Sequence, residues 1–267
     1  MQDLRVTLVQ TDLAWEDAGA NRAMLAGKFA ALKGATDLIV LPEMFTTGFS
    51  MRSAELAETM DGPTVAWMRQ QAAALDAAIY GSMIMHEDGR YTNRGIFMRP
   101  DGSMAWYDKK HLFRMGEENN HYTTGNKRVV TEFRGWRILL QICYDLRFPV
   151  FARSRSIAGR GDYDLMLYVA CWPSARHYAW QHLLIGRAIE NQACLVGVNR
   201  VGTDGNGLQY GGGCTALDAL GQPVEAFPQS DGEWVRTVTL EAGPMLALRK
   251  KFPVALDADA FELSGRN

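Results

Sequence analysis

The sequence predicts an α/β protein in which two β-sheets face each other and helices lie on their outer sides. Strand-like and helix-like patterns alternate in the first third of the chain, and several strand-like patterns then follow with little helix between them. With 267 residues, 47% of them hydrophobic, the chain is long enough to bury a full core. We expect one domain over residues 1–267, because no linker-like segment divides the sequence.

The first elements are recognised by their periodicity and by the residues that end them. Pro63 suits the first turn of a helix, and Pro42 cannot sit comfortably inside a central strand. A short strand should therefore end before Pro42 and place Glu43 at its tip. The expected elements are strands over residues 4–10, 37–43 and 78–84, and helices over residues 21–33 and 63–77.

The middle of the chain is dominated by strand patterns that read as hairpins. The expected strands cover residues 92–97, 104–108, 129–133 and 137–142. Aromatic residues favour the second of these strands. The glycine-rich stretch over residues 202–213 lies between two strand-like runs, so we interpret it as a loop. It lacks the strand, G-x-G-x-x-G and helix order of a dinucleotide site.

Composition excludes several classes of function. A formal charge of -2 with mixed signs gives no basic patch for nucleic acid and no polybasic membrane anchor. Four cysteines in a chain of this length do not indicate a disulfide framework. The chain opens directly into a strand, without an apolar signal segment, and no run reaches the length of a membrane span. We therefore expect a cytoplasmic protein with neither nucleic-acid nor membrane partners.

Three chemically distinct side chains follow the ends of predicted strands. Cys143 comes directly after the apolar run of residues 137–142, Lys109 follows the strand over 104–108, and Glu43 follows Pro42. A single cysteine is more often a buried, inert residue than a nucleophile. The carboxyl ends of strands in α/β proteins are nevertheless where ligands bind. The three positions together therefore predict one site built from neighbouring strands.

These segments resemble those of the nitrilase, or carbon–nitrogen hydrolase, superfamily. LPEMFTTGFS (41–50) is similar to its glutamate motif, YDKKHLF (107–113) to its lysine motif and QICYDLRFP (141–149) to its cysteine motif. Further similarity covers GRAIENQ (186–192) and the glycines at 211–213. The resemblance implies a four-layer α-β-β-α sandwich and a Glu43, Lys109 and Cys143 triad. It selects Lys109 over Lys110, because the functional lysine lies two positions before the histidine.

The chemistry of such a triad can be stated from the residue types. A thiol with a pKa of about 8.5 is mostly protonated at neutral pH, so it needs a general base, for which Glu43 is the candidate. Lys109 would offset the repulsion between thiolate and carboxylate. Lys109 and the backbone N–H of Tyr144 would stabilise an oxyanion, and one such donor contributes about 3 kcal/mol. Attack on an amide would give a thioester, which water hydrolyses without any metal or organic cofactor.

The resemblance also implies a second glutamate that supports the lysine and the base. In the family it lies seven residues before a loop glycine, and Glu118 before Gly125 fits that spacing. Glu117 fits less well. The alternative for both residues is an ordinary solvated loop charge.

Substrate-binding residues are less sharply indicated. Arg147, four residues past Cys143, could bind a substrate carboxylate through two hydrogen bonds, or could form a structural salt bridge with Asp145. Aromatic residues in or near the motifs could form the pocket wall or ordinary core, and they are Phe45, Phe49, Phe113 and Trp172. Cys171 stands where the family usually has asparagine, a change close to the site that could alter pocket polarity.

The motifs look most like the ω-amidase branch, whose members hydrolyse monoamides of 2-oxo dicarboxylic acids. The resemblance implies a hydrolase of non-peptide carbon–nitrogen bonds in linear amides, acting on 2-oxoglutaramate or 2-oxosuccinamate. Its partners would be a small carboxylated amide and further copies of the chain, in a homodimer or higher homo-oligomer. Alternatives are a nitrilase, an N-carbamoyl amino acid hydrolase, or a non-catalytic binding or scaffold protein with the same fold.

Two other groupings of reactive or metal-binding residues have less support in the sequence. A Cys-His dyad would use His111 as the base for Cys143. His111, His121 and the cysteines lack the C-x-x-C or H-x-x-x-H spacing of a zinc site, so we expect no metal.

Overall fold

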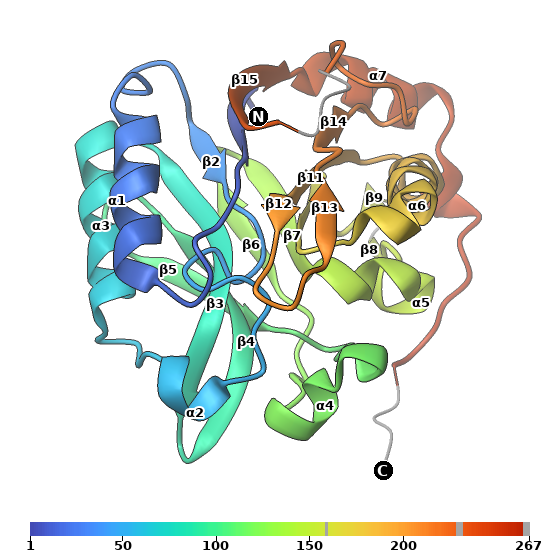
Figure 1. Ribbon diagram of the computed structural model, residues 1–267. Coiled ribbons are helices and arrows are strands. Elements are labelled where there is room, and N and C mark those ends of the chain that lie inside the picture. Colours follow the sequence, from blue (N-terminus) through green and yellow to red (C-terminus); the bar gives the residue numbers. More distant parts are fainter. Residues whose placement is uncertain (158–159, 228–231, 264–267) are drawn as a thin grey trace.

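Two main sheets face each other in the computed structural model, which describes residues 1–157, 160–227 and 232–263 (Figure 1). Within these ranges, six strands form one sheet in the order β15-β1-β2-β3-β4-β5, and five form the other in the order β14-β11-β10-β7-β6. Helices α1 and α3 cover the outer face of the first sheet, and α5 and α6 lie outside the second. The predicted class, two facing sheets with outer helices, is confirmed.

The first sheet and its helices come mainly from the amino-terminal half. Its strands are β1 (Leu4–Gln10), β2 (Leu38–Val40), β3 (Ala78–Glu87), β4 (Arg90–Met98), β5 (Met104–Asp108) and β15 (Trp234–Leu240). The helices are α1 (Ala18–Phe29), α2 (Ser53–Leu56) and α3 (Pro63–Leu75). Strands β1, β2 and β3 are parallel, whereas β3, β4 and β5 form an antiparallel meander.

The second sheet and the connecting elements complete the chain. Its strands are β6 (Val130–Phe133), β7 (Trp136–Ile142), β10 (Leu165–Ala170), β11 (Cys194–Asn199) and β14 (Thr215–Leu217). The α-helices are α4 (Glu118–His121), α5 (Pro149–Ala152), α6 (His177–Asn191) and α7 (Ala242–Lys251). The 3-10 turns are η1 (Arg114–Gly116), η2 (Cys143–Arg147), η3 (Ser174–Arg176) and η4 (Val254–Leu256). Two short ribbons pair β8 (Ser156–Ile157) with β9 (Arg160–Gly161), and β12 (Val201–Thr203) with β13 (Gln209–Gly211).

The short strand β2 shows why the sandwich forms. Leu38 and Val40 join the core cluster that lies between the sheets, whereas Ile39 joins the cluster under α1 and α3. Successive side chains of a strand point to opposite faces, so a strand buried on both faces must be apolar throughout. The uninterrupted Leu-Ile-Val run therefore places β2 in the interior.

Several predicted elements have other bounds in the structure; the strand expected over residues 37–43, for example, covers only Leu38–Val40. The first helix covers Ala18–Phe29 rather than residues 21–33, because the Asp17 side chain accepts from the Ala20 N–H and starts the helix earlier. The stretch over 202–213 is not a loop throughout, since parts of it pair as β12 and β13. Only its centre turns, where the Asp204 carboxylate accepts from the N–H groups of Asn206 and Leu208.

The strand ends at one edge of the sandwich carry the predicted polar residues. Glu43 follows β2, Lys109 follows β5, Cys143 follows β7, and Cys171 follows β10. A search of the described residues found no helix with the length and apolar character needed to cross a membrane.

Candidate active site

Cys143 is the first residue of the 3-10 turn η2 and directly follows strand β7. Its φ of 46° is in the left-handed region, which is rare for a residue with a side chain. Holding such a residue there costs about 1–3 kcal/mol, so the surrounding contacts must enforce the conformation. The residue as a whole is 8% exposed. The turn therefore presents the thiol at the strand end with only a small part of it open to solvent.

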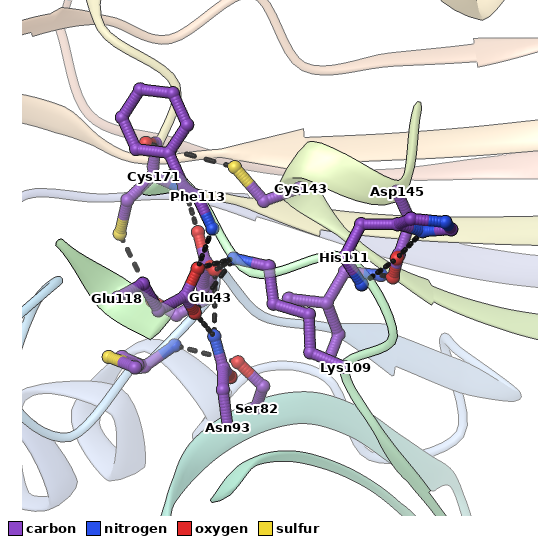
Figure 2. Close-up of polar contacts among 12 residues, drawn as sticks. Glu43, Ser82, Asn93, Lys109, His111, Phe113, Glu118, Cys143, Asp145 and Cys171 are labelled. Carbon is purple, nitrogen blue, oxygen red and sulfur yellow. Dashed lines mark hydrogen bonds and ion pairs between the residues drawn. The ribbon is translucent and has the colours of Figure 1, made fainter. Parts of the chain in front are cut away.

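The Asp145 carboxylate fixes this turn. One of its oxygens accepts from the Tyr107 hydroxyl at 2.8 Å and the Ile142 N–H at 3.0 Å. The other accepts from the His111 N–H at 3.0 Å and pairs with the His111 Nδ1 at 2.8 Å. Asp145 thus ties the turn of Cys143 to the segment that carries Lys109, as Figure 2 shows.

Glu43, Lys109 and Glu118 form a buried cluster of charges behind the thiol (Figure 2). The Lys109 ammonium donates to Glu43 Oε1 at 2.7 Å. It also donates to the two oxygens of Glu118 at 3.0 and 2.9 Å. All three side chains have no exposed surface. Buried charges persist only when they are paired and hydrogen-bonded, which is the arrangement found here.

Asn93 in β4 completes the cluster and was missed in the sequence. Its amide donates to Glu43 Oε1 at 2.8 Å and to Glu118 Oε1 at 3.1 Å. A flipped amide would point its oxygen at two carboxylates, so this orientation follows from the network. The available signal was a short polar amide inside a predicted strand.

A close contact holds the loop that carries Glu118 against strand β5. The Gly125 N–H donates to the Lys109 carbonyl at 2.9 Å. A Cβ at Gly125 would lie 2.0 Å from the Asp108 carbonyl oxygen, so a side chain cannot be accommodated there. The Glu118 carboxylate also accepts from the Phe113 N–H at 2.6 Å. The glycine spacing of the sequence thus has a physical basis, and Glu118 is a buried partner of Lys109 rather than a solvated charge.

Burial and the neighbouring charges shift the pKa of each group in a specific direction. Burial acts to lower the pKa of Lys109, but Glu118 and Glu43 outweigh it and raise that pKa well above its usual range. Burial raises the pKa of Glu118, although Lys109 opposes this effect. Burial and then the charge of Glu43 raise the pKa of the Cys143 thiol, with Lys109 acting against them. The resting site therefore combines a protonated thiol with a cationic Lys109.

Cys171 holds Glu43 in place. Its N–H donates to Glu43 Oε2 at 2.9 Å, and its thiol points to the Glu43 carbonyl oxygen at 3.2 Å. Its carbonyl oxygen lies 3.9 Å from the Cys143 sulfur. Burial raises the pKa of the Cys171 thiol. This residue therefore contributes its backbone to the site while its own thiol is turned away from Cys143.

Half-buried aromatic rings lie beside the cluster. The Lys109 ammonium lies 5.2 Å from the centre of the Phe49 ring, and the Phe49 and Phe113 ring centres are 6.5 Å apart. Phe113 meets the Tyr144 ring edge-on at 5.0 Å. Within the part of the chain that the structure describes, the Tyr144 N–H donates to no acceptor outside its own turn. That donor lies directly after the thiol.

The placement of Phe45 at the site is wrong, and the structure supports neither of two open alternatives, an Arg147–Asp145 salt bridge and a dyad of Cys143 with His111. Phe45 does not line the site, because it packs in the core under α1 and α3 beside Trp67. Arg147 does not pair with Asp145, whose oxygens already accept from other groups, and instead lies exposed over the Trp172 ring at 5.1 Å. The His111 ring bonds to Asp145 and stacks on Phe148 at 3.8 Å, which turns it away from the role of base for Cys143.

Comparisons with known proteins show extensive similarity. A model of the carbon-nitrogen hydrolase family matches residues 5–249. The omega-amidase YafV of Yersinia enterocolitica is 46% identical over 266 residues, which are 98% of this chain and 100% of that protein. The omega-amidase YafV of Escherichia coli strain K12 is 44% identical over the same length and coverage. XC1258 of Xanthomonas campestris, described as a CN-hydrolase superfamily protein with an arsenic adduct in its active site, is 48% identical. The two structures agree with a TM-score of 0.95 over 99% of this chain and 100% of that one.

Proposed function

Because the chain belongs to the carbon-nitrogen hydrolase family, as its motifs predicted, we propose that it is an ω-amidase using Cys143 as nucleophile. Its substrates would be 2-oxoglutaramate or 2-oxosuccinamate. One observation carries the proposal: a thiol in a left-handed turn stands next to the buried cluster of Glu43, Lys109 and Glu118. The similarity to two omega-amidases of equal length supports the choice of substrate class.

In the first half-reaction, Cys143 attacks the carbon of the substrate amide while Glu43 takes the thiol proton. Because the thiol is protonated at rest, the proton must leave as the carbon–sulfur bond forms, and a nearby carboxylate is the suitable acceptor. The carbonyl oxygen becomes negative in the tetrahedral intermediate. When the carbon–nitrogen bond breaks, Glu43 returns the proton to the leaving nitrogen, and ammonia departs from a thioester.

In the second half-reaction, water replaces ammonia. Glu43 takes a proton from the water as its oxygen attacks the thioester carbon, and the carbon–sulfur bond then breaks to release the carboxylic acid. The proton on Glu43 returns to the sulfur, so the enzyme ends in its starting state. These steps use side chains of the chain alone.

Lys109 and Tyr144 would stabilise the oxyanion in both halves. The raised pKa of Lys109 keeps its ammonium charged throughout the working pH range. The Tyr144 N–H, adjacent to the nucleophile, is a second donor, and such a donor contributes about 3 kcal/mol when it is correctly placed. Glu118 would hold Lys109 in position and balance its charge.

The substrate site would be small and anion-selective. Because Cys143 is only 8% exposed, a small amide fits the opening better than a folded protein does. Arg147 would bind the substrate carboxylate from its place over Trp172, and Phe49 and Phe113 would pack against the carbon chain. We also propose that the protein is cytoplasmic, which agrees with its four buried free cysteines, and that it forms a homo-oligomer, as the family resemblance implies.

Ammonia release provides the test. Purified wild-type protein should release ammonia from 2-oxoglutaramate, and Cys143→Ala should lose at least about a thousandfold in kcat, because a nucleophile cannot be bypassed. Cys194→Ala, which removes another buried thiol at the start of β11, is the matched control and should keep near-wild-type activity. Far-UV circular dichroism and melting temperature would establish that both variants fold.

Parallel assays separate the alternatives. Glutamine, a simple nitrile and an N-carbamoyl amino acid are tested beside 2-oxoglutaramate. Turnover of the nitrile or the carbamoyl compound alone would replace the proposal with the corresponding hydrolase. Silence on every compound would favour a non-catalytic binding protein, and full activity in Cys143→Ala would refute the nucleophile.

A further inference from the structure

Two arginines near the site, one exposed and one half-buried, lie over aromatic rings. The Arg147 guanidinium carbon is 5.1 Å from the centre of the Trp172 ring, and that of Arg176 is 5.2 Å from the centre of the Phe113 ring. Arg147 ends the turn after β7, and Arg176 ends the turn η3 that follows β10. Both cations therefore come from segments that follow strand ends at the edge of the site.

Short links connect Arg176 to the reacting groups. The Trp172 indole N–H donates to the Arg176 carbonyl at 2.9 Å, which anchors the backbone of Arg176. Phe113, the ring under its guanidinium, donates its N–H to Glu118 and packs against Tyr144, the residue after the nucleophile. The guanidinium of Arg176 thus lies over the ring of a residue whose backbone N–H binds Glu118.

Arg176 and Arg147 each lie over an aromatic ring, and neither forms an ion pair within the described ranges. Buried arginines elsewhere do so, as Arg94 does with Asp108 at 2.7 Å and Arg128 with Asp162 at 2.6 Å. A guanidinium on an aromatic face keeps its N–H groups available, because the ring contacts its plane rather than its donors. Two guanidinium groups without an ion pair, one in the same turn as Cys143 and one in the turn after β10, favour recognition of an anion.

We propose that Arg176 is a specificity-determining residue that, with Arg147, binds the 2-oxo-carboxylate end of the substrate. This inference rests on the proposed function and deepens it. A 2-oxo acid presents three oxygen acceptors on adjacent carbons and no donor, which suits two sets of guanidinium N–H groups. Glutamine carries an ammonium group at the same carbon. Two guanidinium groups repel that ammonium, so Arg176 separates 2-oxo acid amides from amino acid amides.

Four amides with the same five-carbon chain test the inference. They are 2-oxoglutaramate, glutaramate without the oxo group, glutamine with the ammonium group, and uncharged pentanamide. In Arg176→Gln, we expect kcat/KM for 2-oxoglutaramate to fall about 10- to 100-fold, the loss expected for a charged hydrogen bond. The change should lie mainly in KM, because this contact is made equally in ground and transition states.

The preference for 2-oxoglutaramate over pentanamide, and over glutamine, should fall by a similar factor. Arg176→Lys should fall in between, because it keeps the charge but loses the planar set of donors. Arg69→Gln removes an exposed arginine on the outer helix α3 and should leave every ratio as in the wild type. Added salt should raise the KM for 2-oxoglutaramate more in the wild type than in Arg176→Gln.

A purely structural role for Arg176 predicts a different pattern. If it only supported the Phe113 ring, its loss would lower activity on all four amides equally, and unchanged preference ratios would overturn the inference. Failure of the proposed function is visible separately in the wild type. A wild type that hydrolyses 2-oxoglutaramate, with variant ratios unchanged, refutes Arg176 alone. A wild type that prefers pentanamide or glutamine refutes the anion specificity as well.

Discussion

Asn93 illustrates how one uncharged residue controls the charges of the site. Its amide donates to Glu43 and to Glu118, so it holds two carboxylates that would otherwise repel each other around a single ammonium. No charged residue could do this without changing the balance of the cluster. The sequence offered only an asparagine within a strand, and the meaning of that position depends on which side chains the fold brings to it.

Asn93→Asp replaces that donor with a third carboxylate of nearly the same shape. We expect kcat to fall at least about 100-fold at pH 7, because two charge-assisted hydrogen bonds, each contributing about 1.5–3 kcal/mol, are lost. The added negative charge should also raise the pKa of Glu118 further, so the acidic limb of the pH–rate profile should move to higher pH. Ammonia release measured from about pH 5 to about pH 9 checks both effects.

A matched control separates this electrostatic effect from a general loss of structure. Asn206→Asp makes the same change at an exposed position in the β12–β13 turn and should leave the profile unaltered. Wild-type activity in Asn93→Asp would mean that Asn93 does not set the charge balance.

At the scale of elements, the turn η2 acts through its own aspartate. Each oxygen of Asp145 accepts from one backbone N–H, that of Ile142 or that of His111. The contact to Ile142 supports the left-handed turn at Cys143, and the contact to His111 brings in the lysine segment. The same residue therefore orients segments that belong to different sheets.

Asp145→Asn tests this arrangement with almost no change in volume. Whichever way the new amide is oriented, its NH₂ group faces one of the two backbone donors, so one buried hydrogen bond becomes a repulsion. We expect a loss of about 2–4 kcal/mol in the free energy of unfolding, or roughly 5–10 °C in melting temperature. The effect on kcat should be larger than the effect on KM, because the variant displaces the thiol. Asp259→Asn, an exposed position near the end of the described chain, is the control. An unchanged melting temperature in Asp145→Asn would contradict the role given to this carboxylate.

Secondary structure was predictable where periodicity and end signals agreed. Strands β1 and β5 have the expected bounds, because alternating or fully apolar runs are closed on both sides by polar or turn-forming residues. Helix α1 begins and ends earlier in the chain than predicted. Its start is set by the cap at Asp17, which lies outside the apolar pattern that predicted the helix. The pairing of β12 with β13 was not predicted, because the glycines of this stretch indicated a loop.

At the scale of the whole molecule, sequence motifs located the parts of the site but not their partners. The positions after β2, β5 and β7 follow from where apolar runs stop, and the fold brings Glu43, Lys109 and Cys143 to one edge. Asn93 and Arg176 could not be assigned in this way, because their roles depend on contacts between residues distant in sequence. Phe45 was instead assigned to the site wrongly, since an aromatic residue beside a strand end can equally face the core.

Packing between the two sheets buries the nucleophile together with its charged neighbours. Glu43 and Lys109 follow strands of the first sheet and are fully buried, and Cys143 follows a strand of the second and is 8% exposed. Burial and the charge of Glu43 raise the pKa of Cys143, although Lys109 acts against them. A raised pKa favours the neutral thiol, so the free enzyme should keep its thiol proton at pH values where an ordinary cysteine has lost it.

This protonation state predicts how reactivity depends on pH. The alkylation rate of Cys143 by iodoacetamide should still be rising above about pH 9, whereas that of glutathione levels off near the ordinary thiol pKa of about 8.5. By contrast, kcat/KM for 2-oxoglutaramate should stay flat from about pH 7 to about pH 9, because the reactive form pairs a protonated thiol with an ionised base. Stopped-flow alkylation and ammonia release over the same pH series measure the two profiles. An alkylation midpoint below about pH 8 would instead mean that Lys109 stabilises a resting thiolate, and the direction assigned to this pKa would be wrong.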